Sequence, residues 1–200
     1  MKKNFRPILI VAWVTTVACA PTGSAAEAQV PKGTNVNPDA KQMADFRAKV
    51  DAYEKLRTDL AADSPKLKET IDPGAIAEAE KVLAAKIRAA RSSAKRGDIF
   101  TPATEAMFRR LLRPQVTGTR DAADNKAIIK DDAPKPQEVP FRINGEYPKD
   151  APLSTVPPDV LKSLPPLPEH VQYRFVGRHL ILYCTRGNLI VDYMLNAMPS

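Results

Sequence analysis

Apolar residues between positions 38 and 131 recur every three or four residues, a spacing that places them on one face of a helix. A proline that follows Asn, Asp or Thr is typical of a helix start, because the preceding side-chain oxygen can accept from a free amide. Such starts occur at Asn37, Asp72 and Thr101. The pattern predicts four helices, over 38–62, 73–96 (stopped by Gly97), 102–113 (stopped by Pro114) and 120–131.

Strands are predicted in the last part of the chain. Three short runs rich in β-branched and aromatic residues, at 171–176, 180–183 and 189–193, are separated by turn residues. Joined in this order they form an antiparallel three-stranded meander within 171–200. Because side chains alternate along a strand and both alternating sets are apolar, we expect both faces of the sheet to be covered.

The helices of 38–131 are expected to cover one face, and the segment 132–170 the other. Prolines recur too densely in 132–170 for a long helix, so we expect an extended connection packed on the body, with one short helix at 158–163. Runs of helices followed by runs of strands are typical of the α+β class. The predicted fold is one α+β domain over 38–200, with an N-terminal helical hairpin, shorter helices and a small C-terminal sheet.

Residues 1–28 have the three parts of a secretory signal peptide. The positive start consists of Lys2, Lys3 and Arg6. An uncharged apolar run then extends to Ala20, and it is shorter than the roughly 20 apolar residues that span a bilayer. Small residues follow and allow cleavage after Ala28 or, as an alternative, after Ala26. Residues 29–37 lack any periodicity and are expected to form a flexible tether, so the mature chain has no predicted transmembrane span.

Cys19 offers an alternative to plain cleavage. The stretch Thr16-Val17-Ala18-Cys19 is similar to a bacterial lipobox, and a lipid on this cysteine would tether the protein to a membrane without changing its fold. After cleavage at Ala28 or Ala26, by contrast, Cys184 would be the only cysteine of the mature chain. No intramolecular disulfide could form, and we expect Cys184 to be buried, as free cysteines commonly are.

The formal net charge of the 200 residues is +7, and the predicted signal peptide contains three basic residues and one acidic residue, Glu27. The remaining excess is mild, which argues against a dedicated nucleic-acid binder. Arg88, Arg91 and Lys95 fall on one face of the predicted second helix, where they could bind an anionic polymer or another envelope component. The alternative is that this basic helix simply faces the more acidic first helix.

Candidate chemistry is sparse. The sequence contains no cofactor fingerprint, and its histidines, His170 and His179, are not at metal-ligand spacing with another ligand, so we expect neither a cofactor nor a metal. His179, Asp192 and Arg178 are the candidates for a catalytic site. Asp192 interrupts the apolar run of the last strand, and regular alternation places it on the face of Ile190. Its simpler interpretation is a surface position or an ion pair with an arginine.

Five segments of the chain carry a resemblance to known sequences: 96–102, 108–112, 164–169, 173–178 and 188–193. They resemble segments of an uncharacterised family of exported bacterial proteins of unknown function. The resemblance covers most of the mature chain and implies an exported protein, but it implies no activity. Members of that family often carry a polar or acidic residue and a histidine in the turn where this chain has Cys184-Thr185-Arg186, a departure that weakens any proposal of a site at this turn.

The sequence therefore predicts an exported periplasmic or secreted protein that binds a partner in the cell envelope and is not an enzyme. Two alternatives remain. The first is a hydrolase-like enzyme with a site near His179 and Asp192, which requires these side chains to converge in one pocket. The second is a structural module whose long helices associate with other copies of the chain.

Overall fold

The computed structural model describes residues 38–62 and 72–199, which belong to one compact unit extending over 36–200. The predicted signal peptide, the tether and the lipidation motif at Cys19 lie outside the described residues. The helices are α1 (Pro38–Ala62), α2 (Pro73–Ala90), α3 (Pro102–Val116), α4 (Arg120–Asp132) and α5 (Pro158–Ser163). The strands are β1 (Val171–Val176), β2 (His179–Cys184) and β3 (Leu189–Met194).

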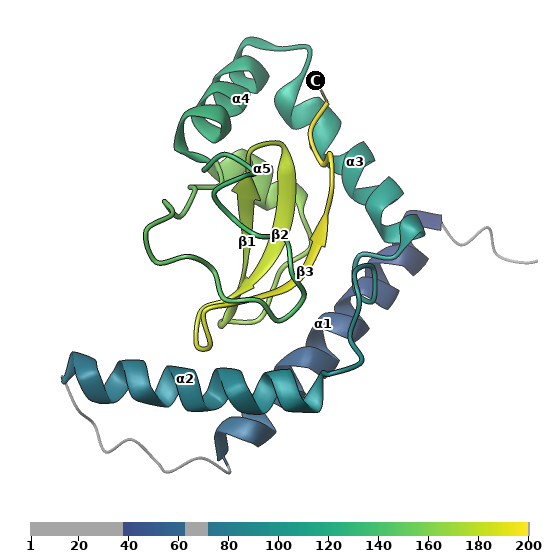
Figure 1. Cartoon of the computed structure of the whole chain (residues 1–200). Coiled ribbons are helices and arrows are strands. Elements are labelled where there is room, and N and C mark those ends of the chain that lie inside the picture. The colour runs from purple at the N-terminus through teal and green to yellow at the C-terminus, as the bar shows by residue number, and fades with distance from the viewer. Residues whose placement is uncertain (1–37, 63–71, 200) are drawn as a thin grey trace, which may run out of the picture. The chain divides into compact units, whose positions relative to one another are not determined.

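The α+β class is confirmed, with a three-stranded antiparallel sheet in the order β1-β2-β3 after the main helices. Helix starts follow the capping pattern: the side chains of Asp72, Thr101 and Thr119 accept main-chain N–H groups of α2, α3 and α4. Helices α1 and α2 contact each other and cross in Figure 1. None of the described helices is long and apolar enough to cross a membrane.

Helix α2 ends at Ala90, earlier than the predicted stop at Gly97. In a continued helix the N–H of Lys95 would donate to the carbonyl of Arg91. Instead it donates to the carboxylate of Asp98 at 2.9 Å, so the chain leaves the helix. The apolar spacing beyond residue 90 therefore belongs to a loop, and the prediction of one helical face that carries Arg91 and Lys95 is wrong.

Helix α3 differs from its prediction in the opposite direction. It continues past Pro114 and ends at Val116. Proline lacks an N–H and therefore removes one hydrogen bond, but near the end of a helix only a single turn depends on it. The hydroxyl of Thr117 donates to the carbonyl of Arg113 at 2.7 Å, which satisfies a main-chain acceptor of this last turn.

Both faces of the sheet are buried. The β2 residues of the first face are Leu180, Leu182 and Cys184. They join the main core, to which α1, α2 and α3 contribute their apolar sides. On the second face, Ile181 and Tyr183 pack against Val139 and Tyr147 of the proline-rich segment, which passes across the sheet in Figure 1. Helices thus cover one face, and the connection before the sheet covers the other.

A bulge in β3 changes which residues face the helices. Leu182 lies opposite Asp192 and Tyr183 lies opposite Ile190, so Val191 is the extra residue on β3. Because alternation is interrupted there, Asp192 shares the face of Leu182, while Ile190 packs with Tyr183 on the other. The expectation that Asp192 and Ile190 share a face is therefore wrong, and Asp192 points into the protein.

Candidate functional site

Asp192 is fully buried, and main-chain amides surround its carboxylate. One oxygen accepts from the N–H groups of Gly97 at 3.1 Å and Tyr193 at 2.8 Å. The other accepts from Ile99 and Phe100, both at 2.8 Å. A buried carboxylate needs such partners to offset the loss of water. With two donors on each oxygen, Asp192 fastens β3 to the loop between α2 and α3.

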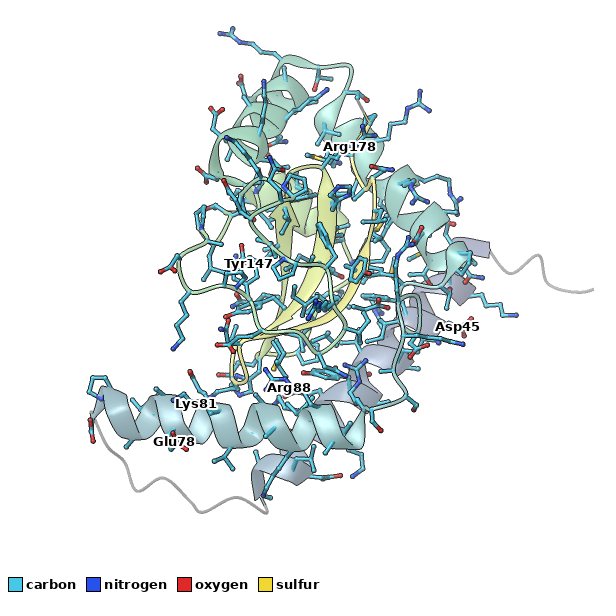
Figure 2. The ribbon with its side chains drawn as sticks, viewed as in Figure 1. Asp45, Glu78, Lys81, Arg88, Tyr147 and Arg178 are labelled. Atoms are coloured by element: carbon cyan, nitrogen blue, oxygen red, sulfur yellow. The ribbon has the colours of Figure 1, made fainter. Side chains whose placement is uncertain are left out.

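His179 and Arg178 lie away from Asp192. The Nδ1 atom of His179 accepts from the N–H of Asn196 at 2.9 Å, and its ring meets Phe141 edge-on with centroids 5.1 Å apart. Burial, together with the nearby Arg178, lowers the pKa of His179. Phe141 belongs to the cluster on the second face of the sheet, whereas Asp192 faces the helices. Arg178 lies at the β1–β2 turn (Figure 2).

These three candidates therefore do not converge on one pocket. Asp192 lies in β3, His179 begins β2, and Arg178 lies in the turn before β2. The hydrogen bonds of the Asp192 carboxylate and of the His179 ring come from main-chain N–H groups. Such contacts position the chain, but they give no arrangement of base, nucleophile and orienting group. Among the described residues there is also no cluster of three or more His, Cys, Asp or Glu side chains that could hold a metal ion.

Of the three basic residues in the second helix region, Arg88 and Arg91 both bind Asn144, whereas Lys95 does not join them. Arg88 donates from Nε to the carbonyl of Asn144 at 3.1 Å, and Figure 2 shows it on α2. Arg91 donates to Asn144 Oδ1 at 2.7 Å and to the carbonyl of Val191 at 3.3 Å. The side-chain amide of Asn144 donates back to the Arg91 carbonyl at 3.0 Å. Lys95 lies on the exposed loop that follows.

Cys184 is buried, as predicted, in the contact region of α1 and the sheet. The guanidinium carbon of Arg91 lies 4.9 Å from the centre of the Tyr53 ring, within the range of a cation–π contact. Burial, followed by the neighbouring Cys184 thiol, raises the pKa of the Tyr53 hydroxyl, which therefore stays protonated. The thiol and the phenol form part of the packed interior between α1 and the sheet.

The feature best suited to hold a ligand lies elsewhere, at the outer edge of β1. An open cleft of about 790 Å³ runs between this strand and the proline-rich segment that includes α5. Its apolar lining includes Val156, Leu161, Leu164, Pro166 and Tyr173. The volume falls within the range of about 300–1,000 Å³ typical of ligand clefts. Leu161 is 49 % exposed at the cleft, so its apolar surface is accessible from solvent.

The main-chain groups on the outer edge of β1 can be assigned from the hydrogen bonds of Phe175. The N–H of Phe175 donates to Ser154 Oγ at 2.8 Å, and the same hydroxyl donates to the Phe175 carbonyl at 2.9 Å. Phe175 and Leu180 are therefore a pair without mutual hydrogen bonds, and in an antiparallel ladder such pairs alternate with bonded ones. Tyr173, opposite Leu182, is the next unbonded pair, so its N–H and C=O point away from β2.

Chain segments on either side cover part of this edge. The N–H of Val171 donates to the carbonyl of Pro168 at 3.1 Å. The hydroxyl of Ser154 hydrogen-bonds to both main-chain groups of Phe175. Within 38–62 and 72–199, no group hydrogen-bonds to the N–H or C=O of Tyr173, although its hydroxyl donates to the Pro165 carbonyl at 2.9 Å. Tyr173 thus offers one main-chain donor and one acceptor to an occupant of the cleft.

The opposite edge of the sheet has its own partner segment. The N–H of Asn144 donates to the carbonyl of Ile190 at 2.8 Å, and the N–H of Ile190 donates to Gly145 at 2.8 Å. The pairing continues at Tyr147, whose main-chain N–H donates to the carbonyl of Asn188 at 3.0 Å. The sheet therefore has one edge paired by its own chain and another that is unpaired only at Tyr173, beside an apolar cleft. Unpaired edges are natural sites for strand pairing.

Sequence reasoning missed this cleft, although a signal was present. The run 164–168 contains three prolines, and proline cannot donate to a sheet ladder. A proline-rich segment beside an edge strand therefore packs against it without pairing along its full length.

Comparison of the chain with protein-family models, curated proteins and solved structures found no match.

The role of Asp192 as a structural anion predicts the effect of Asp192→Asn. The amide group keeps one acceptor oxygen but turns an NH₂ toward two main-chain N–H groups that need an acceptor. We expect the free energy of unfolding to fall by on the order of 3 kcal/mol, measured by urea denaturation of the mature chain.

The matched control is Asp98→Asn. Asp98 lies in the same loop but is partly exposed, and its carboxylate accepts the N–H of Lys95. An amide oxygen can still accept that bond, so the loss should be about 1 kcal/mol or less. Equal losses in the two variants would contradict the structural role assigned to Asp192.

Proposed function

We propose that this chain acts outside the cytoplasm as a non-enzymatic binding protein of the cell envelope, and that the cleft beside β1 is its binding surface. The observation that carries the proposal is the combination of an open apolar cleft with unpaired main-chain groups of Tyr173 at its base. An apolar cavity with a few fixed polar groups is the common form of a ligand site.

The arrangement of the earlier candidates favours binding over catalysis. Asp192 is held by four main-chain amides, and His179 contacts Asn196 and Phe141 on the other face of the sheet. The hydrolase-like alternative needs these two side chains in one pocket. Binding of an anionic polymer by Arg88, Arg91 and Lys95 is weakened as well, because Arg88 and Arg91 hydrogen-bond within the domain.

Export is supported by the order of charged, apolar and small residues in 1–28. When the full chain is produced in a bacterium, we expect the protein released from the periplasm to begin at Gln29. Intact-mass measurement of the released chain tests this directly. A chain that begins at a lipid-modified Cys19 would show tethering instead, and a chain that keeps its first residues inside the cell would contradict export.

Binding through the cleft can be tested in living cells with a photoreactive amino acid at Leu161. We expect illumination to join the chain to one component of the cell envelope, identified by mass spectrometry, because Leu161 is exposed within the cleft. Ile128 is the matched control, since it is 43 % exposed on α4, away from the cleft. The same adducts from both positions, or none from Leu161, would contradict the proposal.

A further inference from the structure

We infer that the occupant of the cleft is a short extended peptide segment of a partner protein, which pairs with the free edge of β1 at Tyr173. This inference rests on the proposed function and adds the class of ligand. It is motivated by the edge itself: the N–H and C=O of Tyr173 point away from β2, on the side of the strand where the cleft lies, and Tyr173 lines that cleft. An extended peptide presents a donor and an acceptor with matching spacing on every second residue.

The edge also limits the length of the pairing. Ser154 occupies the position beside Phe175, and Pro168 occupies the position beside Val171. An incoming peptide therefore finds one residue, Tyr173, with both main-chain groups free. The pairing amounts to a single bridge, so the remaining affinity must come from side chains in the cleft. A second copy of this chain fits poorly, because its own β1 edge is flanked by the same two segments.

The walls of the cleft indicate which side chains such a peptide carries. Val156, Leu164 and Tyr173 belong to the main core and line the cleft on the helix-covered side of the sheet. Because the side chains of an extended peptide alternate, those that point to this side meet an apolar wall. Leu161 adds an exposed apolar rim on α5. The inward-facing positions of the peptide are therefore apolar.

The peptide side chains that point to the opposite face of the sheet lie near the positive charge of Arg174. Arg174 follows Tyr173 on the opposite face and lines the cleft, where it donates to the carbonyl of Ser154 at 3.2 Å and to the side chain of Gln172. Its Nε–H is buried and has no hydrogen-bond partner among the described residues. Lys162, which pairs with Asp159, and Glu169 also line the cleft with opposite charges, so Arg174 supplies the excess positive charge. A carboxylate beside Arg174 would pair with the positive charge of its guanidinium, so the peptide is expected to carry an acidic residue there.

The test begins with a random peptide library displayed on phage, selected on the mature chain and, in parallel, on the Leu161→Asp variant. Leu161 is half exposed, so this substitution changes the cleft without disturbing the core. We expect enrichment on the unaltered chain of peptides with alternating apolar residues and an acidic residue. The absence of enrichment above the variant would overturn the inference of a peptide ligand.

The main-chain pairing has its own readout. In the free chain, the Tyr173 amide should exchange with solvent faster than those of Gln172 and Arg174, whose positions in the ladder pair them with β2. Saturation with a selected synthetic peptide should slow Tyr173 exchange at least ten-fold, measured by nuclear magnetic resonance. N-methylation at one amide of that peptide should weaken binding about ten-fold, while methylation of its neighbours is tolerated.

These outcomes separate the inference from the proposed function. If selected peptides bind and the Tyr173 amide keeps its exchange rate, the strand pairing is wrong while the cleft remains a binding surface. If the Leu161 cross-link fails in cells, the proposed function falls whatever the peptides do. Replacement of Arg174 by glutamine should reduce the preference for acidic peptides, and an unchanged preference would overturn the role assigned to its guanidinium.

Discussion

The carboxylate of Asp192 joins the helical half of this domain to its sheet. It comes from β3 and accepts N–H groups from the loop that follows α2, so two segments more than ninety residues apart share one anion. Gly97 contributes to this arrangement with a φ of +88°, a conformation that residues with a side chain rarely adopt. The loop conformation and the buried charge therefore depend on each other.

The same contact positions the aromatic centre of the core. Phe100 donates its N–H to Asp192, and its ring packs against Phe46 of α1 and Phe108 of α3, with centroids 5.7 and 5.1 Å away. Phe108 in turn lies 5.9 Å from Tyr173, the residue at the base of the cleft. A continuous set of packed rings thus connects the Asp192 loop with the edge of β1. The open edge is held by a rigid interior, as a binding surface requires.

Local signals in the sequence were sufficient for the fold class. The capped starts of α2 and α3, the period of α1 and the three apolar runs after residue 170 depend on neighbouring residues only. The end of α2 was harder to predict, because Asp98 competes for the N–H of Lys95 while the apolar spacing continues as if helical. Similarly, the bulge at Val191 reverses the face of Asp192, and regular alternation cannot reveal it.

The site was less accessible to sequence reasoning than the fold. Arg91 looked like a free surface cation, but its partners Asn144 and Val191 are distant in the chain. The cleft beside Tyr173 depends on where a proline-rich segment packs, which no local pattern specifies. Conversely, Asp192 was easy to recognise as the one charged residue in an apolar strand. Its hydrogen bonds to main-chain N–H groups account for its presence there without a catalytic role. A conspicuous polar residue in a strand can thus mark a structural joint.

Native-state hydrogen exchange tests the joint most directly. If Asp192 fastens the loop to the sheet, the amides of Ile99 and Phe100 should exchange only when the whole domain unfolds. Their opening free energy should then equal that of Ile181 in the central strand. Exchange of the two loop amides through a local opening, at a clearly lower free energy than Ile181, would contradict the claim that this carboxylate holds the two halves together.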